Sequence, residues 1–487
     1  MSDSSYNAGL QEAMDFFDLF LDQEVPLFNR QIGGLYYWHP LRFHFYEMVL
    51  QSKGWIEKQD RRKSTQKIEL IKIAFSLIQH TILHNWRSDA SPSDLLVMNV
   101  TGNVRETHCY SDRYTDPLLA HLSSFSVWEQ PAQWRHRERK PCANHVDLDS
   151  LHAESFLLQP FYRKWEKAIR AEAAHLADWA ETELEVRLSI KKIAFLIRLS
   201  FMYHKILTAP IKRRLIRKKV RCILMVNHYD PIKMLVTRIA KSLGIYVIEL
   251  QHGNMGKYHV PFNFKDPLTL ADLPDEIFTF GSYWNRSNRL HPGQIRLTAT
   301  GMPFYEEQIK TFFETYRPPQ KEKKVILIIS QWTIAHVLGP IVLKLAKTLD
   351  PSEYTIQYKM HPYEYNNWRQ VYSPEFQQSS VQVVCQADLY KLMADSDVHI
   401  GVYSTAVMES LVFNKILILL ESYGLQFILD LVETGRAHLA GNADEVIDII
   451  QTQKPTASDS DVSIYWEKDS IQKMKDRIEE ILSRLED

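Results

Sequence analysis

The chain has 487 residues, which is too long for one ordinary core, so two or three domains are expected. Its hydrophobic fraction of 45% and charged fraction of 24% are ordinary for a globular protein. The formal net charge of −1 creates no global field that would attract nucleic acid or an anionic membrane. We therefore predict no nucleic-acid partner, and any such attraction has to be local.

The cysteines and the apolar runs indicate a compartment. Cys109, Cys142, Cys222 and Cys385 form no C-x-x-C pair, so neither a zinc ribbon nor a disulfide framework is indicated. No apolar run reaches the ~18 residues that a spanning helix needs, and residues 1–11 lack the basic and apolar regions of a signal peptide. We expect a cytoplasmic protein.

The N-terminal part of the chain predicts mostly helices. The first thirty residues predict an amphipathic helix with one apolar patch of Phe16, Phe17, Leu19, Phe20 and Leu21. Residues 68–83 have helical spacing of apolar side chains, and residues 94–100 predict a buried strand. Asp116 is expected to cap a helix that begins at the next proline. Residues 151–219 predict a long helical stretch.

The end of that stretch is basic: Lys212, Arg213, Arg214, Arg217, Lys218, Lys219 and Arg221. One interpretation is peripheral contact with anionic lipid at the inner membrane. The other is a solvated helix that leads into the next strand. The sequence leaves both open.

From residue 220 onward, short apolar runs alternate with helical runs. The alternation covers 221–301, pauses in a polar segment at 314–324, and restarts at 324. Strands separated by helices predict βαβ units and parallel sheets. The expected fold class is therefore α/β, with two Rossmann-like domains facing a cleft and added helices. We expect these limits: an N-terminal domain, 1–310, with a helical insertion at 151–219; a C-terminal nucleotide-sugar-binding domain, 311–465; and a final helix, 466–487.

Ligands of an open parallel sheet bind at the carboxyl ends of its strands, and three such ends of the second block carry polar residues. Ser330 and Gln331 follow the first strand and can hold a phosphate, or can merely cap a helix. Lys359 and His361 are expected on one face of the next strand, before a proline. His361 can donate to a phosphate, or can be satisfied by a backbone carbonyl.

The third strand end is Gly401-Val402-Tyr403-Ser404-Thr405, followed by Glu409. Gly401 permits close backbone approach. Ser404 or Thr405 can cap the next helix, whose N-terminus attracts anions. Glu409 lies one turn further along and suits the ribose hydroxyls of a nucleotide, unless it is only an exposed side chain.

The first block offers two candidate catalytic residues. His252 follows a buried strand and precedes Gly253, so it can act as a general base on a hydroxyl or can be structural. Asp230 ends the preceding strand, before Pro231. It can be a base, a covalent nucleophile or only a helix N-cap.

Several motifs resemble bacterial GT-B glycosyltransferases of capsule and O-antigen lipopolysaccharide clusters. They are QHG (251–253), FTFGSYW (278–284), TGMP (300–303), KMHP (359–362) and GVYSTAVMES (401–410), with fainter likeness in GGLYYWHPLRF (33–43) and YTDP (114–117). The HP and Ser/Thr motifs are similar to those of CMP-sugar-dependent sialyl and Kdo transferases. QHG is similar, more distantly, to the teichoic acid glycerophosphotransferase motif.

The resemblance implies transfer of a sugar from a CMP-sugar, such as CMP-Kdo or a CMP-nonulosonate, to a surface-polysaccharide or glycolipid acceptor. It implies that His361 contacts the donor phosphate, that Ser404 and Thr405 bind it, and that Glu409 binds the ribose. His252 or Asp230 would be catalytic. No cofactor and no catalytic metal are expected. Two alternatives stay open: a nucleotide-sugar epimerase on the same fold, and a non-catalytic scaffold for polysaccharide assembly.

Overall fold

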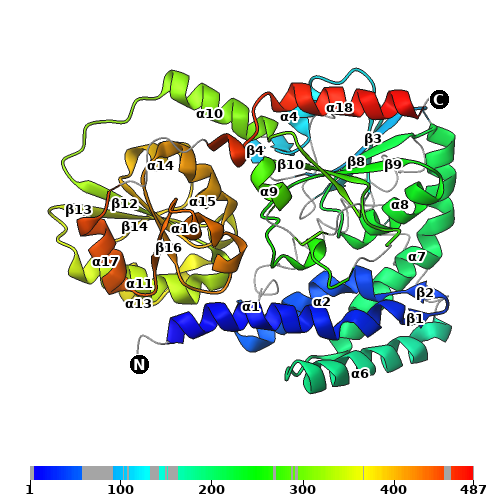
Figure 1. Cartoon of the computed structure of the whole chain (residues 1–487), viewed down its shortest axis with the longest axis horizontal. Coiled ribbons are helices and arrows are strands. Elements are labelled where there is room, and N and C mark those ends of the chain that lie inside the picture. The colour runs from blue at the N-terminus through cyan, green and yellow to red at the C-terminus, as the bar shows by residue number, and fades with distance from the viewer. Residues whose placement is uncertain are drawn as a thin grey trace, which may run out of the picture.

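The computed structural model describes residues 5–56, 91–101, 104–106, 109–131, 142–148, 151, 163–266, 270–286, 289–290, 294–365, 367–454 and 462–485. It contains two parallel sheets, each in its own lobe (Figure 1). This arrangement confirms the predicted α/β fold with two Rossmann-like domains of the GT-B type. The helix expected at 68–83 lies outside the described residues.

The N-terminal sheet has seven strands, and every neighbouring pair is parallel. Their spatial order is β11 (Arg296–Ala299), β10 (Glu276–Thr279), β9 (Tyr246–Leu250), β8 (Cys222–Val226), β3 (Leu95–Thr101), β6 (Ser126–Pro131) and β7 (His145–Asp147). The five residues of β8 are all buried, because helices cover both faces of the sheet.

Helices from distant parts of the chain cover that sheet. On one face lie α7 (Ile190–Lys218) and α8 (Pro231–Ser242), and on the other lie α4 (Asp116–Leu119) and α18 (Ser470–Arg484). Figure 1 shows α18 lying across the N-terminal lobe although it ends the chain. The C-terminal helix is therefore part of the N-terminal core.

The C-terminal sheet has six strands, all parallel. Their order is β14 (Gln382–Val384), β13 (Tyr354–Lys359), β12 (Lys324–Ile329), β15 (Val398–Gly401), β16 (Ile416–Leu420) and β17 (His438–Ala440). The larger helices of this lobe are α11 (Ala335–Thr348), α14 (Leu389–Asp395) and α17 (Ala443–Thr452). The sequence analysis did not identify β17 and α17.

The chain connects the lobes through α10 (Pro303–Thr315) with the link that follows it, and through the segment that returns to α18. The helix α10 runs through the expected boundary at 310, and an extended link follows it at 316–323. A Cβ atom at Gly281 or Gly301 would lie 2.3 Å from a carbonyl oxygen of the segment that returns to α18. These two glycines, from the FTFGSYW and TGMP motifs, therefore make room for the returning chain. The division of the chain at 310 and 465 stays a prediction.

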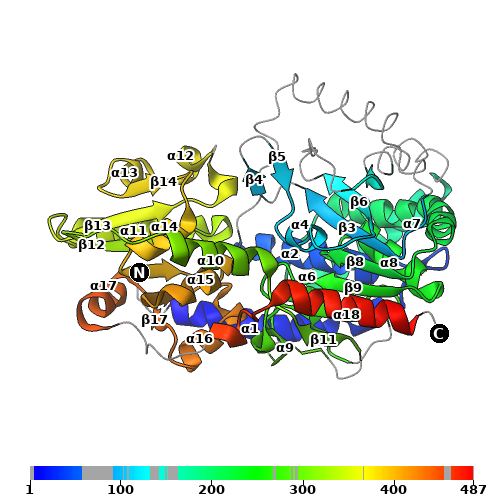
Figure 2. The ribbon, with the colours of Figure 1, turned by 90° about the horizontal axis from the view of Figure 1, so that it is seen from above.

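The N-terminal helices form a further layer below the first lobe (Figures 1 and 2). This layer contains α1 (Ser5–Gln23), α2 (Trp38–Lys53) and α6 (Glu166–Glu183), packed against α7. Arg42 is fully buried there and forms an ion pair with Glu24 at 2.5 Å. Helix α1 also reaches the second lobe, where Leu10 joins its core.

Two helix predictions were wrong in detail, and a third is refined by the structure. The first helix ends at Gln23 and a 3-10 turn follows, and Leu19 is 39% exposed although the other four residues of the apolar patch are buried. The stretch 151–219 is not one helix, since the chain leaves the helical conformation between α6 and α7. Asp116 is the first residue of α4 rather than its cap, which is Thr115.

The shorter elements complete the chain: β1 (Gln31–Ile32), β2 (Leu35–Tyr36), β4 (Val104–Glu106), β5 (Cys109–Ser111), α9 (Ser282–Arg286), α12 (Trp368–Val371), α13 (Pro374–Gln377), α15 (Thr405–Glu409) and α16 (Asp430–Glu433). No helix within the described residues is long and apolar enough to span a membrane.

Candidate functional site

Each sheet reverses its strand order at one point, and that point is where a doubly wound sheet binds its ligand. In the C-terminal sheet the reversal lies between β12 and β15, which are neighbours. In the N-terminal sheet it lies between β3 and β8. The predicted residues Ser330, Gln331, Ser404 and Thr405 follow the first pair, and Asp230 follows β8.

The loops after β12 and β15 are bonded to each other. The Thr333 hydroxyl forms a hydrogen bond with the Tyr403 hydroxyl. Burial raises the pKa of Tyr403 to about 12, while Thr333 and Gln331 oppose that rise, so this phenol stays protonated. Gly424 packs against the Tyr403 ring, because a Cβ there would lie 1.9 Å from a ring carbon.

Ser404 and Thr405 lie where an anion site was expected. The Ser404 hydroxyl accepts from the Ala406 N–H at 3.2 Å and so caps α15, and both predicted residues are half-buried. At Gly401 a Cβ would lie 2.5 Å from a Val407 methyl carbon, so glycine lets the strand end pack on this turn. The helix α15 has only five residues, so these hydroxyl groups, rather than a helix dipole, are its polar feature.

Glu409 is buried, and both of its carboxylate oxygens have partners. Arg113 of the N-terminal lobe donates to Oε1 at 2.9 Å, and Tyr390 donates to Oε2 at 2.7 Å. The exposed Glu409 that the sequence left open is therefore ruled out. In this state the ribose-binding role requires the carboxylate to exchange one of these partners.

The strand end at β13 is organised by Glu364, which the sequence analysis missed. This buried carboxylate accepts from the Ser330 hydroxyl at 2.5 Å, from the His361 N–H at 2.8 Å and from the Tyr372 hydroxyl at 2.7 Å. It joins the ends of β12 and β13 in a capping box. A Glu three residues after a capping residue is the signal that could have identified it.

Lys359 and His361 do not share one strand face as expected. The strand ends at Lys359, whose ammonium group donates to Met360 O, Cys385 O and the Tyr365 hydroxyl. His361 lies in the following turn and its Nδ1 accepts from the Tyr363 N–H at 3.3 Å. Burial, with the Lys359 charge, lowers the pKa of His361 to about 4, so the neutral ring carries its proton on Nε2.

On the N-terminal side, His252 stands within a buried polar cluster. Its Nε2 lies 3.0 Å from the Tyr229 hydroxyl, and its Nδ1 lies 3.6 Å from Oε1 of Glu249. The side chain is 19% exposed. Burial lowers the pKa of His252 to about 4, although the Glu249 carboxylate acts to raise it. The ring is therefore neutral near pH 7 and can accept a proton.

Glu249 is a second residue that the sequence analysis did not assign. Its carboxylate is fully buried and receives the His228 ring Nδ1 at 2.5 Å and the His228 N–H at 3.1 Å. Burial raises the pKa of Glu249, but the His228 contacts outweigh it and the pKa lies below its ordinary value. A charged residue inside the otherwise apolar strand IYVIELQ was the available signal.

Asp230 takes the simplest of its three predicted roles in this structure. Its Oδ1 accepts from the Ile232 and Lys233 N–H groups, so it caps α8. Its Oδ2 lies 3.4 Å from the Gln130 amide nitrogen. Asp230 also stands at the reversal point of the sheet, and its hydrogen bonds within the described residues go to α8 and Gln130 rather than to the His252 cluster.

The His252 loop touches the second lobe. Asn254 donates through its amide to the Tyr403 carbonyl oxygen at 2.6 Å. Gly256 packs so closely that a Cβ there would lie 2.6 Å from the Phe427 carbonyl oxygen. The QHG loop of one lobe therefore meets the GVYST loop of the other.

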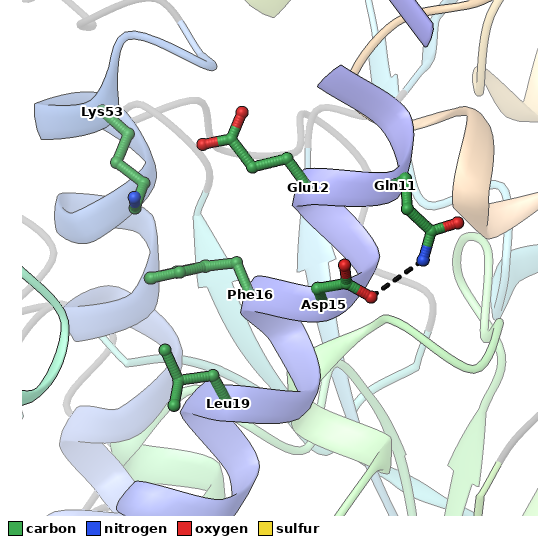
Figure 3. A pocket seen from close by; sticks show the side chains of 6 residues that line it. All are labelled: Gln11, Glu12, Asp15, Phe16, Leu19 and Lys53. Atoms are coloured by element: carbon green, nitrogen blue, oxygen red, sulfur yellow. Dashed lines mark hydrogen bonds between the residues drawn. The ribbon is translucent and has the colours of Figure 1, made fainter. Parts of the chain in front are cut away.

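Two other features lie apart from these strand ends. A shallow hollow between α1 and α2 is lined by Gln11, Glu12, Asp15, Phe16, Leu19 and Lys53 (Figure 3). Glu129, His145 and Asp147 cluster at the ends of β6 and β7, where His145 Nε2 lies 3.2 Å from Asp147 and 3.9 Å from Glu129. Glu129 and Asp147 have further partners, so we assign this cluster no ligand.

Comparisons with known proteins give distant likenesses. No family model matches the chain and no curated protein matches it. It is similar to the S. aureus MnaA–UDP structure, with 12% identity, TM-score 0.46, and 80% of this chain and 97% of that chain covered. It is also similar to the UDP-GlcNAc 2-epimerase from Neisseria meningitidis bound to UDP-GlcNAc, with 14% identity, TM-score 0.45, and 80% of this chain and 99% of that chain covered. The calicheamicin glycosyltransferase CalG4 is similar at 10% identity and TM-score 0.41, with 81% of this chain and 99% of that chain covered. Activity is therefore argued from the site alone.

Proposed function

We propose that the chain is a glycosyltransferase that moves a sugar from a nucleotide-activated donor to a carbohydrate or lipid-linked glycan acceptor. The observation that supports this most is the meeting of the two strand-end loops. The loop that carries His252 contacts the loop that carries Ser404 through the Asn254–Tyr403 hydrogen bond. A general base from one lobe and a phosphate-binding turn from the other are what group transfer across a cleft needs.

The nucleotide lies at the ends of β12, β13 and β15 in this proposal. Ser404 and Thr405 bind the donor phosphate, and His361 donates to it from the protonated Nε2. Lys359 and Ser330 do not contact the donor in this proposal, because their polar groups are already bonded within the lobe. They hold the His361 turn in place instead. Gln331 lies beside the Tyr403 hydroxyl, at the edge of the same site.

The acceptor hydroxyl lies near His252. As its oxygen attacks the anomeric carbon, the bond from that carbon to the donor phosphate breaks and the nucleotide leaves with its electrons. The acceptor hydroxyl replaces the Tyr229 hydroxyl as the partner of His252 Nε2, which takes the hydroxyl proton, and the Glu249 carboxylate stabilises the imidazolium that forms. We propose His252 as the base and Asp230 as the cap of α8. Single displacement by this route inverts the anomeric configuration.

Ribose binding at Glu409 proceeds by exchange in this proposal. The two ribose hydroxyls replace the Arg113 guanidinium as the partner of the Glu409 carboxylate. A cytidine nucleotide is the donor base that the sequence resemblance favours, and it is the first to be tested.

The first experiment is thermal unfolding with CMP, CDP, UDP or GDP. A ligand at about 100 times its dissociation constant stabilises the native state by ~2.7 kcal/mol. That corresponds to a rise of roughly 2–4 °C for domains of this size. His361→Asn should reduce the shift, whereas His121→Asn, on the exposed end of the first lobe, should leave it unchanged.

The second experiment measures turnover of the donor that binds. Loss of transfer in His252→Asn with an unchanged nucleotide shift would support the base assignment. Full transfer by that variant would reject it. Donor conversion without any acceptor would support the epimerase, and the absence of binding to all four nucleotides would favour the scaffold.

A further inference from the structure

Helix α7 presents a basic face to solvent at its C-terminal end. We define this basic face by five exposed residues: Lys212, Arg213, Ile216, Arg217 and Lys219. Lys212, Ile216 and Lys219 recur at helical spacing, so they lie along one line of the helix. Ile216 is 55% exposed in the middle of these four cations. A single exposed aliphatic side chain is ordinary on a protein surface, so what distinguishes this face is that Ile216 lies among four cations.

The structure separates the seven basic residues of this run into two groups. Arg214 and Lys218 are buried, and the Lys218 ammonium donates to the Ser91 carbonyl oxygen at 2.9 Å. Arg221 pairs with Asp94 at 3.0 Å and so helps to fix the sheet. None of the four cations of the basic face forms an ion pair or hydrogen bond with a described residue. Within the described part of the chain, these four side chains therefore hold no element in place.

No acidic residue dilutes this charge along the chain. The sequence from 186 to 229 contains no Asp and no Glu. The N-terminal end of α7 also combines exposed cations with an exposed apolar side chain. These residues are Lys191, Lys192 and Phe195, and Phe195 is 54% exposed. Phe195 and Ile216 lie on the same side of the helix, about 31 Å apart along its axis.

The position of α7 suits contact with a flat surface. The helix lies along the outer edge of the N-terminal lobe, on the side away from the C-terminal lobe (Figures 1 and 2). A surface that touched this edge would meet both ends of the helix without passing between the lobes. Contact there therefore leaves the two strand-end loops free to meet.

We propose that the basic face of α7 docks the protein on an anionic lipid surface. Four unpaired cations match the negative potential of such a surface, and Ile216 and Phe195 can enter its headgroup region. A nucleic acid or an acidic protein would use the charge but would gain less from two widely spaced apolar side chains. This inference rests on α7 alone and does not depend on the proposed glycosyl transfer.

The test is co-sedimentation of the full chain with vesicles of phosphatidylcholine, with or without phosphatidylglycerol. We expect binding only to the anionic vesicles, and release by high salt. Replacing Lys212, Arg213, Arg217 and Lys219 with Gln should weaken binding on the order of five-fold per charge, which corresponds to about 1 kcal/mol each. Ile216→Ser should weaken binding even though it removes no charge.

The matched control changes the net charge equally on other surfaces. It replaces exposed Lys310, Lys344, Lys347 and Lys454 with Gln and should bind as the unaltered protein does. Circular dichroism confirms that each variant is folded. Equal loss in the control, retained binding in the α7 variant, or no binding of the unaltered chain to anionic vesicles would each overturn the inference. The last result together with binding to RNA would instead assign the face to nucleic acid.

Discussion

Arg113 and Glu409 form an ion pair between the two lobes, with Nη2 and Oε1 2.9 Å apart. The Glu409 side chain is 5% exposed and that of Arg113 is 25% exposed, so water weakens this pair only in part. The pair connects the predicted ribose-binding carboxylate to a residue of the other lobe. If Glu409 binds the ribose as proposed, nucleotide binding and this contact between the lobes compete for the same carboxylate.

The first prediction concerns this pair. Arg113→Met should free the Glu409 carboxylate and strengthen nucleotide binding, measured by the thermal shift. Glu409→Gln should reduce the shift, because an amide offers the two ribose hydroxyls one neutral acceptor oxygen in place of two charged ones. Both variants should lower the unfolding free energy by about 1–3 kcal/mol, since each leaves a charged group without its partner. Weaker nucleotide binding in Arg113→Met would show that Arg113 binds the ligand directly.

The second prediction concerns Glu364. Glu364→Ala removes the acceptor for Ser330, the His361 N–H and Tyr372, so we expect the unfolding free energy to fall by roughly 3 kcal/mol or more. Nucleotide-dependent stabilisation should fall with it, because the His361 turn loses its support. Glu375→Ala is the matched control, since Glu375 is exposed and its ion pair with Lys347 at 3.5 Å contributes little. Equal melting temperatures for the two variants would contradict this role.

The third prediction concerns the docking of α18. Arg477 forms a bidentate contact with buried Glu276 on β10, at 3.0 and 2.7 Å. Arg477→Met removes this bidentate contact and leaves Glu276 with the Tyr246 and Thr298 hydroxyls and with Arg296 at 3.7 Å, so we expect a loss of about 1.5–3 kcal/mol. Arg484→Met removes a side chain that is 62% exposed and should cost little. Limited proteolysis should release the C-terminal helix first in the Arg477 variant, and cleavage elsewhere would argue against its docking role.

The fourth prediction concerns stability in mild acid. Burial lowers the pKa of His399 and of His252 to about 4, against an ordinary value of 6.5. Between pH 6.5 and 4 these histidines are protonated in the unfolded chain but mostly neutral in the native state. The native state therefore becomes less stable as pH decreases through this range. At pH 5 each such histidine costs up to about 2 kcal/mol. Denaturant unfolding at pH 8 and pH 5 measures the loss.

His399→Asn offers the check on that prediction. His399 is 1% exposed and its ring bonds to the Met393 carbonyl oxygen at 3.0 Å, so the substitution lowers stability at both pH values. It should, however, reduce the difference in stability between pH 8 and pH 5. An undiminished difference would mean that His399 is not protonated on unfolding in this range.

Most of the fold, namely the parallel strands and their two blocks, could be predicted from the sequence. Runs such as 222–226 and 416–420 are apolar at every position, and only strands covered on both faces use such runs. Their alternation with helices predicted parallel sheets, and the gap at 314–324 separated the two blocks. Short or amphipathic elements such as β17 were missed because three residues hold too little pattern.

For the candidate site, the sequence predicted the strand ends but not the contacts between them. The sequence predicted which strand ends carry polar residues, because carboxyl ends of parallel strands are binding positions whatever the rest of the fold. It could not show that Glu364 bonds Ser330 to the His361 turn, or that Glu249 lies between His228 and His252. The contacts from Glu364 to Ser330 and from Glu249 to His228 join residues 34 and 21 positions apart, and their distances depend on the sheet register.

The contacts between lobes were decided by tertiary structure alone. Arg113 and Glu409 are 296 positions apart, and Asn254 and Tyr403 are 149 apart. No periodicity extends over such distances, because a local pattern reports only which face of an element is buried. How the lobes meet follows from the packing of α1, α10 and the returning α18. The sequence therefore determined two sheet edges with polar strand-end loops, and the packing of these helices decided that the loops meet.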